Sequence, residues 1–143
     1  MTTPTEAQLA ALGAAFDAFA RRFKLAEASG SEQPLNEIDK QTLFYAARHD
    51  DCGPTDIARY LGVAATTLTS ATDRLVKRGL LERERVAGDR RAVALRLTGA
   101  GQDKVRELEA AYHQMYRQFL DPLTPGEQDA LIHILTKIVQ TEN

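Results

Sequence analysis

The sequence predicts a mainly α-helical protein with one small β-hairpin, in the order helix, helix, helix, helix, hairpin, helix, helix. Two observations lead to this fold class. Apolar residues recur every three or four positions along most of the chain, which is the period of an amphipathic helix. Only after Gly79 does the period change to two, since Val93, Leu95 and Leu97 point one way while the residues between them point the other, which is the pattern of a strand.

Composition limits the classes of protein that need to be considered. The chain has 143 residues, of which 43% are hydrophobic and 27% charged, enough for one domain with a real core. Its single cysteine, Cys52, argues against an internal disulfide framework and fits a reducing cytosol. The sequence shows neither a signal peptide nor an apolar run long enough to span a membrane. We therefore expect a cytoplasmic protein that does not contact a membrane.

The N-terminal helix is expected to be long and to carry one apolar seam, formed by Leu9, Leu12, Phe16, Phe19, Phe23 and Ala26. Glycine, serine and proline in residues 28–34 interrupt it. A second helix begins with Asn36 as its N-cap and has Asp39 in its first turn. The Gly53-Pro54 pair is expected to end this second helix.

Two helices, residues 55–61 and 65–78, follow with Gly62 between them, which is the layout of a helix-turn-helix. Gly62 permits the positive φ that the turn requires. The second of these helices leaves small and basic residues on its solvent side, and short hydroxyls near a helix N-terminus can approach phosphates and base edges closely. The DNA-contacting residues predicted on it are Ala65, Thr66, Thr67, Thr69, Ser70, Arg74 and Lys77.

The predicted hairpin follows Gly79, a glycine placed to end the helix before it. Residues 86–90 supply the turn and put Arg90 and Arg91 at the tip. Basic residues gather between positions 74 and 91 although the chain as a whole has a net charge of −2. A basic hairpin directly after a helix-turn-helix makes a winged helix. Its recognition helix would enter a major groove, and Arg90 or Arg91 would reach the adjoining minor groove. The sequence leaves open which of the two arginines does so.

The C-terminal part is predicted to form two more helices. Thr98 caps the first, whose seam includes Val105, Tyr112 and Phe119. Residues 124–127, Thr-Pro-Gly-Glu, form a capping box with proline at the first helical position, and they open a last helix with its own apolar seam. Little chain remains to cover the seams at either end, which favours a homodimer about a two-fold axis. We thus expect a winged helix-turn-helix lobe in 35–98 and dimerisation segments in 1–34 and 99–143.

Three motifs in order make the chain similar to the multiple antibiotic resistance regulator (MarR) family. They are LGVAATTLTSATDRLVKRGLLER from position 61, GDRRAVALRLTGAG from position 88 and LTPGEQDAL from position 123. The resemblance implies a homodimeric, ligand-responsive transcription factor, in most cases a repressor, bound to pseudo-palindromic double-stranded DNA. It also implies a salt-bridged brace between recognition helix and wing, formed by Asp73, Arg74, Asp89 and Arg91.

One residue departs from the family pattern. Ser70 stands where many members carry a basic residue on the recognition helix. Reading of guanine by a bidentate arginine in the middle of the helix is therefore not available. Specificity would rest more on the threonines, on thymine methyl groups and on DNA shape.

The resemblance further implies an effector pocket between dimerisation helices and DNA-binding lobe, often for small aromatic acids or phenols. Aromatic walls with a few polar groups suit such ligands. The residues predicted to line it are Phe19, Phe23, Tyr45, Arg48, His49, Tyr112 and Tyr116. The alternative interpretation is that these aromatic residues, being at helical spacing, belong to the core.

Two other interpretations remain open. His49 and Cys52, with the two aspartates between them, could sense a metal or an oxidant, although neighbours in one short turn rarely all face one ion. The chain could also be a winged-helix module that binds another protein and has little affinity for DNA. We predict no metal site and no cofactor. No arrangement of residues points to an enzyme, because nucleophile–base pairs, phosphate-binding glycine loops and paired carboxylates in a cleft are not apparent.

Overall fold

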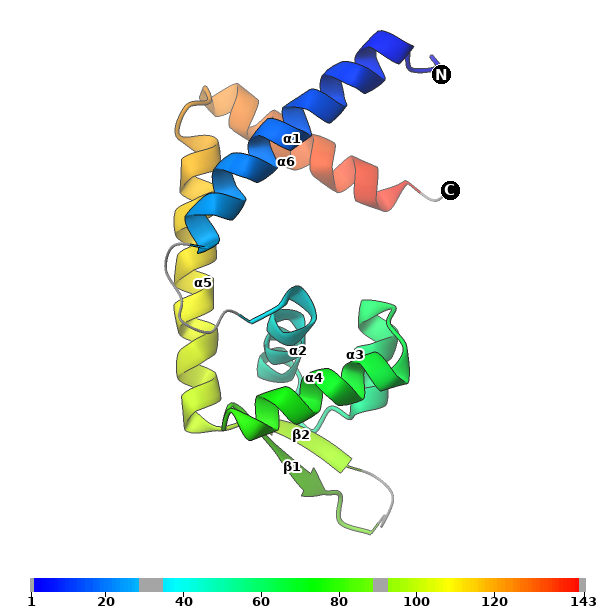
Figure 1. Cartoon of the computed structure of the whole chain (residues 1–143), viewed down its shortest axis with the longest axis vertical. Helices are drawn as coiled ribbons and strands as arrows, with labels where there is room; N and C mark the ends of the chain where they lie inside the picture. The colour runs from blue at the N-terminus through cyan, green and yellow to red at the C-terminus, as the bar shows by residue number, and fades with distance from the viewer. Residues whose placement is uncertain (1, 29–34, 89–92, 142–143) are drawn as a thin grey trace. The chain divides into compact units, whose positions relative to one another are not determined.

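The computed structural model describes residues 2–28, 35–88 and 93–141, which form two compact units, Met1–Asn36 and Glu37–Asn143. The first unit contains helix α1 (Glu6–Ala28). The second contains α2 (Glu37–Arg48), α3 (Pro54–Leu61), α4 (Ala65–Lys77), strands β1 (Leu81–Arg85) and β2 (Val93–Leu97), and helices α5 (Gly99–Leu120) and α6 (Pro125–Gln140) (Figure 1). The predicted order of elements and the mainly helical fold class with one hairpin are confirmed. The division into dimerisation and DNA-binding segments stays a prediction.

The predicted helix starts of the C-terminal part are present. Thr98 caps α5, since its hydroxyl oxygen accepts a hydrogen bond from the Gly101 backbone N–H at 3.0 Å. At the start of α6 the Thr124 hydroxyl accepts from the Glu127 N–H at 3.2 Å, and the Glu127 carboxylate accepts from the Thr124 N–H at 2.9 Å. These bonds satisfy backbone donors that a helix end otherwise leaves open.

The segment between α2 and α3 differs from the prediction. Helix α2 ends at Arg48, before the Gly53-Pro54 pair that was expected to end it. This pair instead begins α3, with Gly53 as N-cap and Pro54 as the first helical residue. Proline suits that position because the first helical N–H has no partner inside the helix in any case. The helix-turn-helix glycine, Gly62, has φ +68° as predicted.

The core of the second unit lies where α2, α3, α4 and β2 meet. Its fully buried side chains include Leu43, Ile57, Leu68, Leu75 and Leu95. Gly101 brings the first turn of α5 against this core, because a Cβ there would lie 2.0 Å from the carbonyl oxygen of Leu80. Any side chain at this position would push α5 away from the loop that precedes the hairpin.

The hairpin is antiparallel, with Leu81 opposite Leu97 and Arg85 opposite Val93. Its base is joined to the turn after α2, because the Leu95 N–H donates to the Cys52 carbonyl oxygen at 2.8 Å. This bond makes Cys52 a short third member of the sheet. The hairpin is therefore anchored to the core through β2 (Figure 1).

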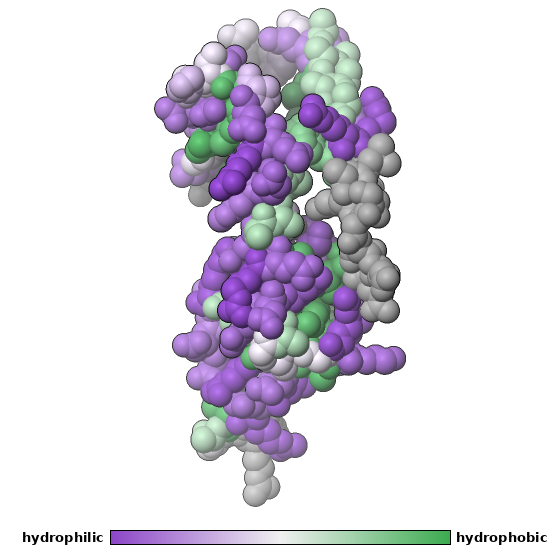
Figure 2. Space-filling view, turned by 90° about the vertical axis from the view of Figure 1, so that its left-hand side faces the viewer, coloured by the Kyte–Doolittle hydropathy of each residue, from purple (hydrophilic) through white to green (hydrophobic). Residues whose placement is uncertain are grey.

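Helices α1 and α6 each expose apolar residues. Four members of the predicted α1 seam, Leu9, Leu12, Phe16 and Phe19, are 45–60% exposed. On α6 the exposed apolar residues are Ile132, Ile134, Leu135, Ile138 and Val139. In contrast, the surface of the winged-helix lobe that Figure 2 shows is mostly hydrophilic. Among the described residues, no helix combines the length and the apolar character that crossing a membrane would need.

Candidate nucleic-acid interface

Helix α4 has one buried and one exposed face. The buried face holds the helix against the core, and none of its residues is more than 1% exposed: Leu68, Ala71, Thr72 and Leu75. The spacing of these residues by three and four turns the remaining positions outward. The predicted contact residues that the structure places on this exposed face are Ala65, Thr66, Thr67, Thr69, Ser70 and Lys77. The face therefore presents small side chains and hydroxyl groups to the solvent.

The hydroxyls on α4 are not equivalent. The Thr69 hydroxyl donates to the Ala65 carbonyl oxygen at 2.9 Å, so its hydrogen is committed to the helix and its oxygen remains an acceptor. Thr72 makes the same kind of bond to Leu68 at 2.8 Å, but it is buried. Ala64, the N-cap of α4, supplies no side-chain hydrogen bond to the first turn. The backbone N–H groups of this turn are thus without a side-chain cap and suit an anionic partner.

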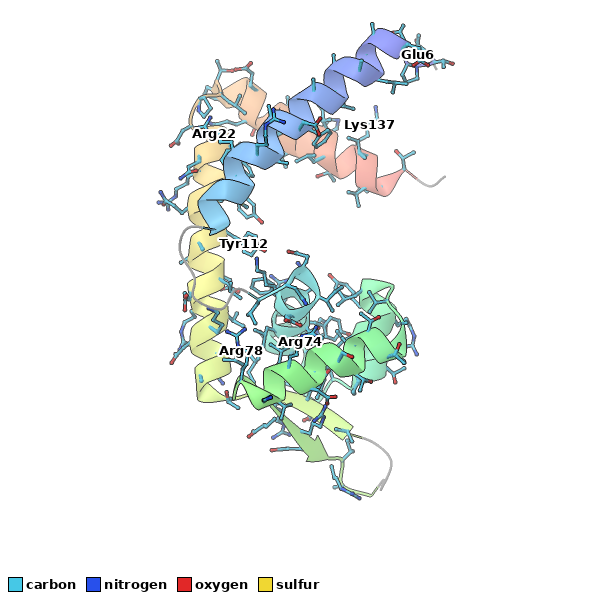
Figure 3. All side chains as sticks on the ribbon, viewed as in Figure 1. Glu6, Arg22, Arg74, Arg78, Tyr112 and Lys137 are labelled. Carbon is cyan, nitrogen blue, oxygen red and sulfur yellow. The ribbon has the colours of Figure 1, made fainter. Side chains whose placement is uncertain are left out.

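Arg74 lies on α4 but its guanidinium binds α2. Figure 3 labels the Arg74 side chain on α4. Its Nη2 donates to Asp39 Oδ1 at 2.8 Å and its Nε donates to Asp39 Oδ2 at 3.4 Å. The carboxylate is buried, whereas the Arg74 side chain remains 47% exposed. The hydrogen bond to Asp39 raises the pKa of Arg74. Arg74 was predicted to contact DNA and to brace the wing. The structure shows its ion pair with Asp39 on the second helix, and both predicted roles stay predictions.

Asp73, the residue before, pairs with the wing. Its Oδ1 accepts a hydrogen bond from Nη2 of Arg83 on β1. A brace between α4 and the hairpin therefore exists, with Arg83 as a partner that the sequence analysis did not single out. The other predicted members, Asp89 and Arg91, lie outside the described residues, as does Arg90. Their part in the brace and in DNA contact stays a prediction.

A third ion-pair group holds the base of the wing. The Arg96 guanidinium on β2 binds Asp51 at 2.6 Å and Glu84 on β1 at 3.0 Å. The hydrogen bond to Asp51, together with both carboxylates, raises the pKa of Arg96. Asp51 has φ +56°, a left-handed conformation that aspartate adopts more readily than most residues. The turn between α2 and α3 is thus joined to both strands of the hairpin.

The predicted effector residues separate into three groups. Arg48, Tyr112 and Tyr116 line a hollow of about 290 Å³ between α2 and α5, together with Glu37, Gln41, Phe44, Glu109 and His113. The rings of Phe44 and Tyr112 are 5.9 Å apart, and those of Tyr112 and Tyr116 are 6.0 Å apart. Five lining residues were not predicted: Glu37, Gln41, Phe44, Glu109 and His113. The side of the hollow that α2 forms could have been predicted from the sequence, because Glu37, Gln41, Phe44 and Arg48 are spaced by four and three and so lie on one face of the helix.

The remaining effector candidates lie elsewhere. Tyr45 stacks on His49 with ring centroids 3.9 Å apart, and the centroid of Tyr60 lies 5.0 Å from that of Tyr45. His49 lines a second hollow of about 590 Å³ with Asp50, Asp51, β2 and the start of α5. Phe19 and Phe23 belong to the first unit, where their rings are 4.7 Å apart.

The Cys52 thiol is buried, and its sulfur lies 3.9 Å from the Leu95 carbonyl oxygen. Burial raises the pKa of this thiol, and the nearby Asp56 and Asp51 carboxylates raise it further. A raised pKa lowers the fraction of thiolate, which is the form that reacts with oxidants and binds metals. Within the described ranges no three histidine, cysteine, aspartate or glutamate side chains are placed to hold a metal ion. Sensing through His49 and Cys52 thus gains no support.

Comparison with known proteins finds similarity to one family over part of the chain. Residues 34–92 match the model of the MarR family. The transcriptional repressor MprA of Escherichia coli is 34% identical over 86 residues, which are 60% of this chain and 49% of MprA. The chain thus spans about half the length of the curated relatives it matches.

Two solved structures show the same fold. Streptococcus pneumoniae FabT in complex with DNA has a TM-score of 0.76 at 22% identity, covering 90% of each chain. Bordetella bronchiseptica BpsR, whose DNA binding is regulated by 6-hydroxynicotinic acid, has a TM-score of 0.70 at 22% identity. That match covers 90% of this chain and 97% of BpsR.

Proposed function

We propose that this chain is a transcriptional repressor of the MarR family that binds operator DNA as a homodimer, and the match of residues 34–92 to the family model supports the proposal. The observation that carries the proposal is the exposed face of α4. Small and hydroxyl-bearing residues form this face, and ion pairs from the adjacent Asp73 and Arg74 join the helix to β1 and α2. A rigidly held helix with short polar side chains suits the major groove.

Direct base reading by α4 would come from Thr66, Thr67 and Ser70. Hydroxyl groups bond to several base edges, and threonine methyl groups contact thymine methyls. Without an arginine at position 70, part of the discrimination would come from the wing and from DNA shape. We expect the wing to contribute through Arg90 or Arg91 in the minor groove.

The apolar surface of α6 supports the homodimer. Ile132, Leu135 and Ile138 lie on one side of the helix and are more than half exposed. Their burial against a second copy would stabilise the dimer, by roughly 1.5–3 kcal/mol for each side chain that becomes fully buried. A two-fold dimer presents two recognition helices, so the operator half-sites should lie about one helical turn, roughly 10 bp, apart.

Selection from a random duplex library followed by fluorescence anisotropy tests this function. We expect the purified protein to enrich a pseudo-palindrome and to bind it at nanomolar concentration, far more tightly than a scrambled duplex. The affinity should fall steeply as the salt concentration rises, because phosphate contacts release counterions. Binding of equal strength to both duplexes would contradict the proposal. That outcome would favour a winged-helix module for protein partners, the alternative that Ser70 and the net charge of −2 support.

The hollow between α2 and α5 is our candidate for the effector site. Its tyrosines and Phe44 offer aromatic walls, and Arg48 and His113 offer groups that bind a carboxylate or phenol. Calorimetry with 6-hydroxynicotinic acid and with salicylate as probes, on the wild type and on Tyr112→Ala, tests the site. We expect binding to be weakened in the variant and to compete with the selected duplex. A probe that bound equally well with and without DNA would not be an inducer.

A further inference from the structure

The buried Asp39 carboxylate is the feature of this molecule that neither the α4 surface nor the effector hollow explains. Asp39 is 4% exposed and lies in the first turn of α2. Burial of a carboxylate is costly unless a cation and hydrogen bonds compensate for the lost water. The Arg74 guanidinium meets this need with two donors, at 2.8 and 3.4 Å, from a residue 35 positions away. The pair therefore fixes one point of α2 to one point of α4.

Because Arg74 lies on α4, its ion pair with Asp39 constrains the orientation of this helix. Arg74 follows Asp73, which is joined to Arg83 of the hairpin. Two adjacent residues of α4 are thus joined to two different elements, α2 on one side and β1 on the other. A paired guanidinium has a planar fork with fixed geometry, so the orientation of α4 about its own axis depends on both partners. Leu68, Ala71 and Leu75 pack the same helix but make no directional bond through their side chains.

The two faces of α2 show what α4 is fixed to. Asp39, Leu43 and Ala46 lie on the face that is buried, at spacings of four and three. Glu37, Gln41, Phe44 and Arg48 lie on the opposite face and line the hollow against α5. Helix α2 therefore packs between α4 and α5, and α5 continues into α6, the helix proposed to meet the second copy. The Asp39–Arg74 pair therefore couples the orientation of α4 to the position of α2, and α2 packs on α5, which leads into the proposed dimerisation helix.

We propose that Asp39 is a positioning residue for DNA recognition, which holds α4 through Arg74 so that the two recognition helices of the dimer match one half-site spacing. This rests on the proposed function. Arg74 then serves to fix α4 to α2. Its substitution lowers the ratio of affinities for operator and scrambled DNA more than it lowers the general affinity for phosphates.

The charges make the proposal testable, because the two variants Asp39→Asn and Arg74→Gln remove charges of opposite sign. General attraction to DNA predicts opposite effects: tighter binding for the first variant and weaker binding for the second. The positioning role predicts the same effect for both. The double variant should be no weaker than either single variant, because each already breaks the pair.

The experiment measures anisotropy with three duplexes at several salt concentrations: the selected operator, the same operator with one base pair inserted between its half-sites, and a scrambled duplex. We expect each variant to lose about tenfold in affinity for the operator, the size of one charged hydrogen bond. Its affinity for the scrambled duplex should be nearly unchanged. Preference for the correct spacing over the inserted one should shrink, which a loss of stability alone would not cause. Thermal unfolding confirms that each variant is folded at the assay temperature.

Three results would overturn the proposal. Tighter binding of Asp39→Asn to all duplexes with weaker binding of Arg74→Gln would make Arg74 a phosphate contact that Asp39 partly masks. A lowered melting temperature with unchanged discrimination would make the pair purely structural. If the wild type enriches no sequence, the proposed function itself fails, and the positioning role with it. Should Asp39→Asn not fold, Arg74→Lys serves instead, since it keeps the charge and loses the two-donor geometry. Unchanged discrimination in that variant would also contradict the proposal.

Discussion

Asp73 and Arg83 join the recognition helix to the wing, while Arg74, the next residue along α4, binds Asp39 on α2. The Asp73 and Arg83 side chains are 62% and 39% exposed, so solvent screens the pair and the stability that it adds is small, about 0–1 kcal/mol. Its value lies in geometry. The hairpin and α4 both belong to the proposed DNA surface, and the pair keeps them in one arrangement.

We expect Asp73→Asn to weaken specific DNA binding, although it removes a negative charge from the surface that would face DNA. Loss of the brace lets the wing move relative to α4, and we expect a three- to tenfold loss of operator affinity, about 1 kcal/mol. Anisotropy with the selected operator measures it.

Glu82→Gln is the matched control for this prediction. Glu82 lies exposed on β1, next to Arg83 in sequence, and its substitution removes the same charge without touching the Asp73–Arg83 pair. We expect the control to bind DNA as tightly as the wild type or slightly more tightly. If Asp73→Asn behaved like Glu82→Gln, the brace would have no role in binding.

We expect Thr67→Ala to lower operator affinity about fivefold, the effect of one hydrogen bond of about 1 kcal/mol. Thr67 is exposed on the first half of α4, where base edges would lie closest. Thr136→Ala on α6 is the control, since it removes an exposed threonine hydroxyl far from α4 in the sequence. Equal affinities for the operator in both variants would remove Thr67 from the base-reading set. The affinity for scrambled DNA should not change in either.

Arg90→Ala and Arg91→Ala should each weaken binding and reduce the slope of log affinity against log salt by up to about one unit, because each removes one contact to phosphate or the minor groove. The larger effect identifies the arginine that enters the groove. The slope is measured over at least four salt concentrations. A wing without a role in DNA binding would leave affinity and slope unchanged in both variants.

We expect Leu135→Glu to convert a dimer into a monomer of 15.8 kDa, read by light scattering after size-exclusion chromatography. A charge in an apolar interface costs several kcal/mol when it has no partner. Gln140→Glu adds the same charge on the other side of α6 and should leave the dimer intact. A monomeric wild type would refute the dimer directly.

Cys52 should react slowly with iodoacetamide in the folded protein at neutral pH and rapidly once the chain is unfolded in denaturant. Its pKa is raised, so the thiolate fraction at neutral pH is smaller than for an ordinary cysteine, and the rate should keep rising at pH values where a free thiol has levelled off. Mass spectrometry of the alkylated protein follows the rate. Fast alkylation at neutral pH would restore the redox interpretation.

The sequence by itself determined the features that depend on neighbours along the chain. Thr98 and the Thr124–Glu127 box mark helix starts, Gly62 marks the turn, and the change of period after Gly79 marks the hairpin. Each of these depends on bonds within one turn of helix or on the φ of one residue, so a short window of sequence contains the whole cause. The motifs that carry the family resemblance are of the same local kind.

The tertiary structure alone decided which side chains meet across elements. Arg74 appeared available to DNA in the sequence, yet it binds a carboxylate 35 residues away. Asp73 pairs with Arg83. Of the effector candidates, Arg48, Tyr112 and Tyr116 line one hollow, His49 lines another, Tyr45 stacks on His49, and Phe19 and Phe23 belong to a separate unit. The sequence offers several oppositely charged residues with which Asp73 or Arg74 could pair. The crossing of α2 with α4 and the position of β1 determine which of them forms the ion pair. That selection depends on how helices pack, because packing sets the distances over which ion pairs and cavities form.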